Sequence, residues 1–166
     1  MALGSNLDGR ETHLRQALRD LNALEGLSEL VCSSLYETAP MGPQDQPDYL
    51  NAVCRFRYAG TARQLMEQLQ RIEQEHGRQL DGRRWGARPL DLDIVLFGEQ
   101  LIREPDLVVP HLGLRERSFV LWPLAELDDT LIVPGGDQEP ARISDLQQQC
   151  EQYGIRRLAG GPLSAE

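Results

Sequence analysis

The sequence has little that would suit a membrane protein or a secreted disulfide scaffold. No run approaches the ~18 consecutive apolar residues of a membrane span, and residues 1–6 lack the basic and apolar regions of a signal peptide. Only three of its 166 residues are cysteines. We therefore expect a cytoplasmic protein without a membrane partner, built as a single domain over residues 1–166 with a poorly ordered tail from about residue 160.

The three cysteines are Cys32, Cys54 and Cys150. An odd and sparse count, without metal-ligand spacing, is atypical of a disulfide framework and fits a reducing compartment. Because Cys32 and Cys54 lie in apolar, strand-like runs, we interpret both as buried small hydrophobic residues.

Positive charge is scarce overall but concentrated in one segment. The formal net charge of −9 argues against a nucleic-acid partner. Charges farther apart than ~8 Å are largely screened, however, so the local balance decides. Residues 71–88 hold five arginines and three acidic residues, a net charge of +2, which leaves −11 for the rest of the chain.

The order of predicted elements indicates an α+β fold. A helix is expected from near Asp8, where Glu11 completes a capping pair, and a second helix from a capping box at Thr61 to Gly77. Strands are expected at 30–38, 49–58, 89–97, 107–109 and 131–133, further helices at 117–127 and 143–150, and a loop at 40–48. This order predicts a ferredoxin-like sandwich, in which helices cover a mainly antiparallel sheet.

Two aspartates stand on one side of a predicted strand. Side chains alternate along a strand, so Leu90 and Leu92 would face a core while Asp91 and Asp93 face the other way, with Cα atoms ~6.6 Å apart. Two magnesium ions ~3.5–4 Å apart would fit such a pair, as in two-metal phosphoryl transfer. By itself the short motif favours two solvated aspartates on an open sheet face.

An arginine-rich loop precedes these aspartates and favours a metal site over two solvated side chains. Guanidinium groups of Arg78, Arg84 and Arg88 suit phosphate oxygens, and neighbouring glycines let the loop bend around a ligand. A phosphate clamp beside two metal-binding carboxylates favours phosphoryl transfer.

The strand predicted at 49–58 presents Tyr49 and Asn51 on one side. An aromatic ring beside an amide can bind a flat heterocycle by stacking and paired hydrogen bonds. Such a pair alone is more often structural.

Five ordered motifs together resemble the 6-hydroxymethyl-7,8-dihydropterin pyrophosphokinase family. The motifs are residues 4–7 (GSNL), 42–51 (GPQDQPDYLN), 84–93 (RWGARPLDLD), 109–111 (VPH) and 119–124 (FVLWPL). The resemblance runs from Ala2 to about Pro134. It implies transfer of pyrophosphate from ATP to a pterin alcohol with release of AMP, a step of folate biosynthesis.

The resemblance also implies roles for individual residues. Asp91 and Asp93 match ligands of two magnesium ions, and Arg78 and Arg88 match catalytic-loop arginines that clamp phosphates. The positions that match the nucleotide side are Gln70, Glu73, Arg84, Trp85, Arg88, Ile94, His111 and Arg117. The positions that match the pterin pocket are Gly4, Thr38, Met41, Tyr49, Asn51 and Phe119. Leu80 and Leu112 depart from the family pattern, which bears on phosphate clamping and on packing against ATP.

Two other functions compete with this interpretation. One is a nucleotidyl- or glycosyltransferase that uses the same two-metal motif, but no patch for a nucleic acid or a nucleotide sugar is evident. The other is a binding module for pterin or nucleotide without turnover, against which the retained aspartates and arginines speak. We expect a monomeric enzyme whose partners are the small molecules ATP and hydroxymethyldihydropterin.

Overall fold

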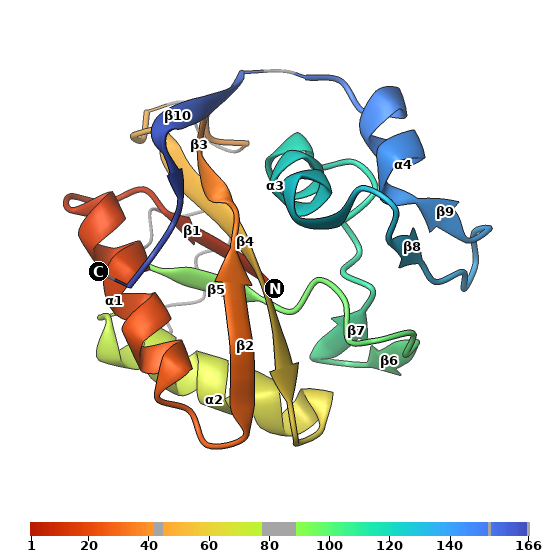
Figure 1. Ribbon diagram of the computed structural model, residues 1–166, viewed down its shortest axis with the longest axis horizontal. Coiled ribbons are helices and arrows are strands. Elements are labelled where there is room, and N and C mark those ends of the chain that lie inside the picture. The colour runs from red at the N-terminus through yellow and green to blue at the C-terminus, as the bar shows by residue number, and fades with distance from the viewer. Residues whose placement is uncertain (42–44, 78–88, 153, 166) are drawn as a thin grey trace.

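The computed structural model describes residues 1–41, 45–77, 89–152 and 154–165. Its centre is a six-stranded antiparallel sheet in the order β10–β3–β4–β1–β5, with β2 paired to β4 (Figure 1). The strands are β1 (Ala2–Ser5), β2 (Leu27–Cys32), β3 (Ser34–Thr38), β4 (Tyr49–Tyr58), β5 (Asp91–Asp93) and β10 (Ile155–Pro162). Within the described residues, no helix has the length and apolar character needed to cross a membrane.

Helices cover both faces of this sheet, which confirms the predicted α+β sandwich. The helices are α1 (Arg10–Asn22), α2 (Ala62–Glu75), α3 (Ser118–Asp128) and α4 (Ile143–Gln149). Two short hairpins complete the fold: β6 (Ile102–Glu104) with β7 (Leu107–Val109), and β8 (Ile132–Val133) with β9 (Ala141–Arg142).

The sheet separates two hydrophobic cores. Leucines of α1 and α2 pack with Leu3, Leu50 and Leu92 on one face. Residues of α3 and α4 pack with Val53 and Val95 on the other. Because neighbouring residues of one strand enter different cores, β1 and β4 are each covered on both faces.

The predicted N-terminal cap is confirmed for α2 and wrong for α1. Thr61 accepts from the Gln64 amide and Gln64 reaches back to the Thr61 amide, so the predicted capping box of α2 is confirmed. The capping pair at Asp8 is wrong: Gly9 is the N-cap of α1, with φ 76°, and no side chain caps the helix. A residue without a side chain tolerates that left-handed backbone.

Two strand predictions need correction. The single strand expected at 30–38 is divided at Ser33 into β2 and β3, and both halves pair with β4. The strand expected at 89–97 is limited to Asp91–Asp93, because its pairing with β1 ends at Ala2. A further strand that was not predicted, β10, pairs with β3, and Leu163 after it is buried.

The prediction of separate thiols at Cys32 and Cys54 is also wrong. Both residues are buried, as expected, but they form a disulfide. They lie directly opposite each other in the β2–β4 ladder. Pairing across strands depends on register, which cysteine spacing along the chain does not reveal.

Candidate functional site

The site is built on one row of residues that crosses the sheet. Gly4 of β1 pairs with Asp91 of β5 on one side and with Asn51 of β4 on the other. Asn51 in turn pairs with Tyr36 of β3. Neighbouring strands lie ~4.8 Å apart, so the backbones of Asp91 and Asn51 are ~10 Å apart with a glycine between them.

These side chains project from the face that α3 covers. The next row joins Asp93, Ala2 and Val53, and both Ala2 and Val53 pack in the core beneath α3. Residues two apart in a strand share a face, so Asp91 and Asn51 lie on this face as well. The predicted alternation around Asp91 and Asp93 is confirmed, with Leu90 and Leu92 buried in the opposite core.

Gly4 leaves space between the carboxylate and the amide. A Cβ atom at Gly4 would lie 3.1 Å from Asn51 Oδ1 and 3.8 Å from the ring of Tyr49. Asn51 is fixed in turn, since its Nδ2 donates a buried hydrogen bond of 2.7 Å to Thr38 Oγ1. One amide hydrogen and the amide oxygen of Asn51 remain to bind a ligand.

The carboxylate end of the row is more open. The side chain of Asp93 is 42% exposed, and its Oδ2 lies 3.9 Å from His111 Nε2. His111 Nδ1 accepts from the Gly113 amide at 3.0 Å. Burial lowers the pKa of His111 below its ordinary value, and Arg117 acts in the same direction while Asp91 opposes it. A neutral imidazole that accepts at Nδ1 carries its proton on Nε2, which faces Asp93.

Glu73 supports the carboxylate strand from behind. Its side chain is buried, and Oε1 accepts from the amide of Leu92 at 2.7 Å. Leu92 lies between the two aspartates, so this bond fixes the backbone that carries both. Glu73 therefore lies in the interior, whereas Gln70 on the same helix is exposed.

The donor set fits magnesium and does not form a complete cage. Among the described residues, no group of three or more His, Cys, Asp or Glu side chains is arranged to hold a metal ion. Magnesium typically takes one or two carboxylates and completes its shell with water and substrate phosphates. Asp91 and Asp93 meet that requirement.

The other predicted site residues are distributed unevenly. Phe119 is half-buried in α3, and the Arg117 guanidinium lies 5.7 Å from the centre of its ring. Ile94 is buried, and Met41 is 60% exposed. The predicted arginines and tryptophan of the loop lie outside the described residues; these are Arg78, Arg84, Trp85 and Arg88.

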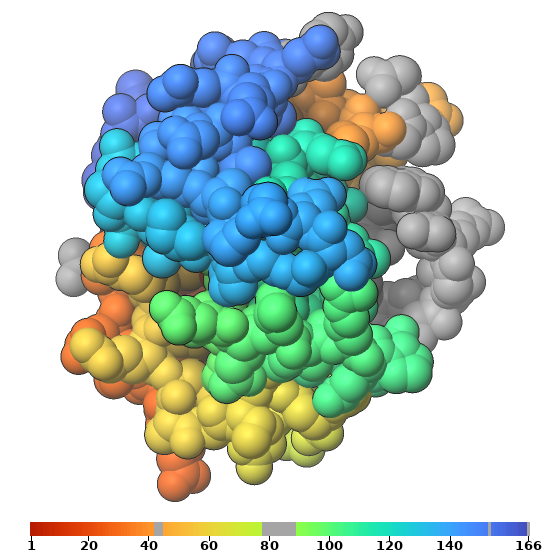
Figure 2. Space-filling model, turned by 90° about the vertical axis from the view of Figure 1, so that its right-hand side faces the viewer, coloured from red at the N-terminus to blue at the C-terminus, as the bar shows by residue number. Residues whose placement is uncertain are grey.

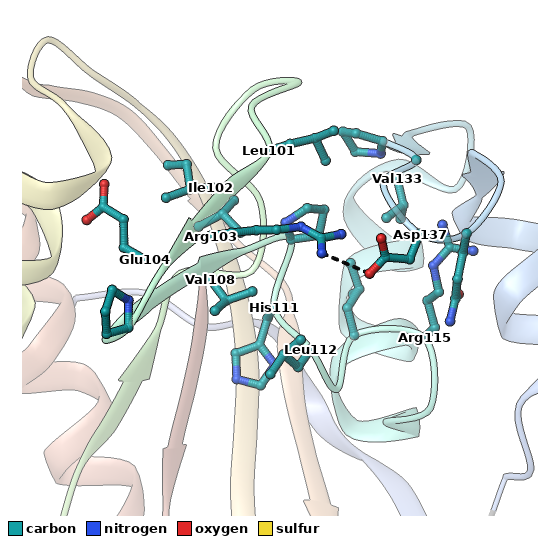
Figure 3. Close-up of a pocket in the computed structure, with 17 residues that line it drawn as sticks. Leu101, Ile102, Arg103, Glu104, Val108, His111, Leu112, Arg115, Val133 and Asp137 are labelled. Carbon is teal, nitrogen blue, oxygen red and sulfur yellow. Dashed lines mark ion pairs between the residues drawn. The ribbon is translucent and has the colours of Figure 1, made fainter.

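A cavity of about 520 Å³ adjoins the carboxylate end. It lies between the β6–β7 hairpin, residues 110–115 and the turn at 133–138. Figure 2 shows this side of the molecule, with the green hairpin between yellow residues of α2 and blue residues of the β8–β9 region. In Figure 3, Arg103 reaches Asp137 across the cavity, and His111 and Leu112 form another part of its wall. No local motif predicts this cavity, because two stretches separated in the chain, 101–115 and 133–138, build it together.

Comparison with known proteins points to one family. The sequence model described as 7,8-dihydro-6-hydroxymethylpterin-pyrophosphokinase (HPPK) matches residues 1–129. A 2-amino-4-hydroxy-6-hydroxymethyldihydropteridine pyrophosphokinase of Haemophilus influenzae is 43% identical over 158 residues, covering 95% of this chain and 96% of that protein. The protein of the same name from Pseudomonas aeruginosa is 42% identical over 160 residues, covering 96% of each. A mitochondrial folate synthesis bifunctional protein of Arabidopsis thaliana is 46% identical over 127 residues, covering 76% of this chain and 23% of its own length.

Proposed function

Because the chain belongs to the 7,8-dihydro-6-hydroxymethylpterin-pyrophosphokinase family, we propose that it transfers pyrophosphate from ATP to the hydroxymethyl group of 6-hydroxymethyl-7,8-dihydropterin. The products are the pterin diphosphate and AMP, in a step of folate biosynthesis. The observation that carries this proposal is the row Asp91–Gly4–Asn51, which sets a carboxylate opposite an amide across an open glycine.

The amide end of the row binds the acceptor. Asn51 reads the hydrogen-bonding edge of the pterin, with Thr38 holding its amide in place. Tyr49 and Phe119 stack on the two faces of the ring, and Met41 lies at the pocket's exposed margin. The gap at Gly4 lets the hydroxymethyl group extend from Asn51 towards Asp91.

The carboxylate end receives the nucleotide. Asp91 and Asp93 would hold two magnesium ions, which when bound orient the triphosphate and offset its charge. Glu73 acts through the Leu92 amide and keeps both carboxylates aligned. His111 presents Nε2 beside Asp93, next to the nucleotide phosphates, and Gln70, Ile94 and Arg117 complete this side.

The loop arginines clamp the phosphates, a role proposed on the family motifs alone. Arg78 and Arg88 would stabilise the charge that develops as AMP departs, with Arg84 and Trp85 against the nucleotide. No described side chain combines the position and chemistry of a dedicated general base. Positioning and electrostatic stabilisation therefore supply most of the acceleration.

The proposal extends to the protein as a whole, which acts as a single domain and as a monomer in the cytoplasm. Its partners are small molecules, and its net charge of −9 argues against a nucleic acid.

Product analysis tests the proposal. Purified protein is incubated with ATP, magnesium and the hydroxymethyl dihydropterin, and the nucleotides are separated by chromatography. AMP and pterin diphosphate should accumulate in equal amounts. ADP in place of AMP would refute pyrophosphate transfer and leave ordinary phosphoryl transfer, whereas binding without product would support a non-catalytic module.

A further inference from the structure

A single carboxylate ties three elements together beside the acceptor pocket. Glu126 of α3 accepts from the Ser34 amide at 3.0 Å, from the Ser34 hydroxyl at 2.8 Å and from the Tyr36 hydroxyl at 2.8 Å. Arg157 of β10 donates to the Ser34 hydroxyl at 2.9 Å and lies 3.3 Å from Glu126 Oε1. The carboxylate thus joins the helix to β3 and to the edge strand.

The sheet end of this cluster belongs to the site row. Tyr36 pairs with Asn51, the residue proposed to read the pterin edge. Two residues further along β3 is Thr38, whose hydroxyl holds the Asn51 amide. Glu126 therefore binds the strand whose Thr38 holds Asn51 in place at the acceptor pocket.

The helix end of the cluster is linked to the pocket through Phe119, which lies on the same helix as Glu126. Phe119 and Glu126 are seven residues apart in α3, which is two turns, so they share a helix face ~10 Å apart. Between them, Val120, Leu121 and Leu124 pack in the core with Val53 of β4. Apolar packing is non-directional, so these contacts define the position of α3 on the sheet less specifically than hydrogen bonds do. The bonds of Glu126 add that direction.

The charge of Glu126 supports this role. Burial would raise the pKa of its carboxyl, but hydrogen bonds from Tyr36 and Ser34 outweigh burial and hold that pKa below its ordinary value. An ionised carboxylate accepts at both oxygens, whereas an amide accepts at only one. Glutamine at this position would keep the size of the side chain and lose part of the cluster.

We propose that Glu126 is a positioning residue that sets the width of the acceptor pocket. It holds α3 at a fixed height on β3, and so fixes the distance between the ring of Phe119 and the floor formed by Tyr49 and Asn51. This inference rests on the function proposed above, because it assumes that a pterin occupies that space.

The test compares substrate affinities in Glu126→Gln and Tyr36→Phe with those in Glu11→Gln. Glu11 makes an ion pair with Arg15 on α1 and serves as a control for charge removal. Hydroxymethyl dihydropterin affinity is measured by fluorescence with a non-hydrolysable ATP analogue present, and affinity for the analogue by calorimetry. All variants are studied at a temperature where circular dichroism shows them folded.

Loss of a charge-assisted hydrogen bond should weaken pterin binding about tenfold in Glu126→Gln. Tyr36→Phe, which keeps the carboxylate, should weaken it about threefold, and affinity for the ATP analogue should stay within twofold in every variant. A lowered melting temperature with unchanged pterin affinity would show a purely structural role and overturn the inference. Equal weakening of both ligands would overturn it as well. Wild-type protein that binds no pterin would instead refute the proposed function, and the positioning role with it.

Discussion

The two ends of the site row differ in how far their side chains are exposed to solvent. At the acceptor end, Thr38 and Asn51 are 5% and 6% exposed and are bonded to each other. At the carboxylate end, the side chains of His111 and Asp93 are 26% and 42% exposed. Both ends are attached to the same sheet and lie within a few strands of each other.

This difference matches what each end is proposed to bind. A flat, neutral heterocycle gains affinity from groups already oriented for it, since little has to be ordered on binding. Carboxylates buried without a cation would be costly, so ligands for an exchangeable metal–nucleotide complex are better left accessible to water. The backbone beneath them is nevertheless fixed through Glu73 and Leu92.

The largest effect should follow removal of the two carboxylates. In the variant Asp91→Ala/Asp93→Ala we expect turnover to fall at least ~1000-fold, because charge stabilisation through a metal is worth several kcal/mol and each ~1.4 kcal/mol is a factor of ten. The variant should stay folded, because neither aspartate belongs to a hydrophobic core. AMP formation and thermal melting measure the two quantities.

Asp145→Ala is the control for this variant, because it removes a carboxylate from an exposed position of α4. It should retain full turnover. Activity close to that of wild type in the double variant would refute the metal assignment. The carboxylate end would then have no separate role in catalysis.

Changes at the amide end should have a smaller effect, which should be confined to binding of the pterin. Asn51→Ala should weaken pterin binding ~100-fold, since two polar contacts of ~1–1.5 kcal/mol each are lost. Thr38→Val should weaken it ~10-fold because the Asn51 amide loses its buried partner. Calorimetry with the pterin and with an ATP analogue measures both affinities. Comparable losses for the nucleotide would show that the two ends are not separate sites.

The gap between the two ends can be tested by filling it. Gly4→Ala would place Cβ 3.1 Å from Asn51 Oδ1, and Asn51 is held by Thr38 and cannot move aside without losing a hydrogen bond. We expect pterin affinity to fall ~10-fold, because displacing that amide costs about one hydrogen bond. Affinity for the nucleotide and the melting temperature serve as internal controls. Unchanged KM for the pterin would mean that the acceptor does not use this gap.

How far the sequence predicts these features depends on the range of the interactions. Alternation predicted the two faces of residues 90–93, and the capping box predicted the start of α2, because both signals are local. The row that joins Asp91, Gly4 and Asn51 depends on register between strands far apart in the chain, and no local pattern specifies it. The Cys32–Cys54 disulfide was missed for the same reason.

The edge strand β10 was not predicted for a different reason. β10 is exposed along most of its length and lacks the alternating apolar residues that mark a half-buried strand. Its partner β3 supplies the backbone hydrogen bonds, and Arg157 binds the Glu126–Ser34 cluster. Glu126 itself carries no motif, so its part in the acceptor pocket became visible only from its contacts.

The smallest effect concerns the stability that this cluster adds at different pH values. The pKa of Glu126 is lower in the folded protein than its ordinary value of ~4.3, so the unfolded chain binds its proton more readily. The ionised cluster therefore stabilises the fold fully above about pH 4.3, and this contribution is lost as the pH falls through the folded-state value. Burial would raise the pKa of Glu37, but hydrogen bonds from Arg156 and Arg10 lower it. Glu37 is present in both wild type and a Glu126→Gln variant, so its contribution cancels in the difference between their stabilities.

Glu126→Gln should accordingly be about 1 kcal/mol less stable than wild type at pH 7 and nearly equal to it at pH 3. Urea denaturation at several pH values measures both free energies of unfolding. Gln74→Ala changes no titratable group at an exposed position of α2, so its difference from wild type should not vary with pH. If Glu126→Gln is still less stable than wild type by the same amount at pH 3, the side chain contributes by packing and not by charge. Protonation of the carboxyl group in wild type would then have left the stability difference unchanged.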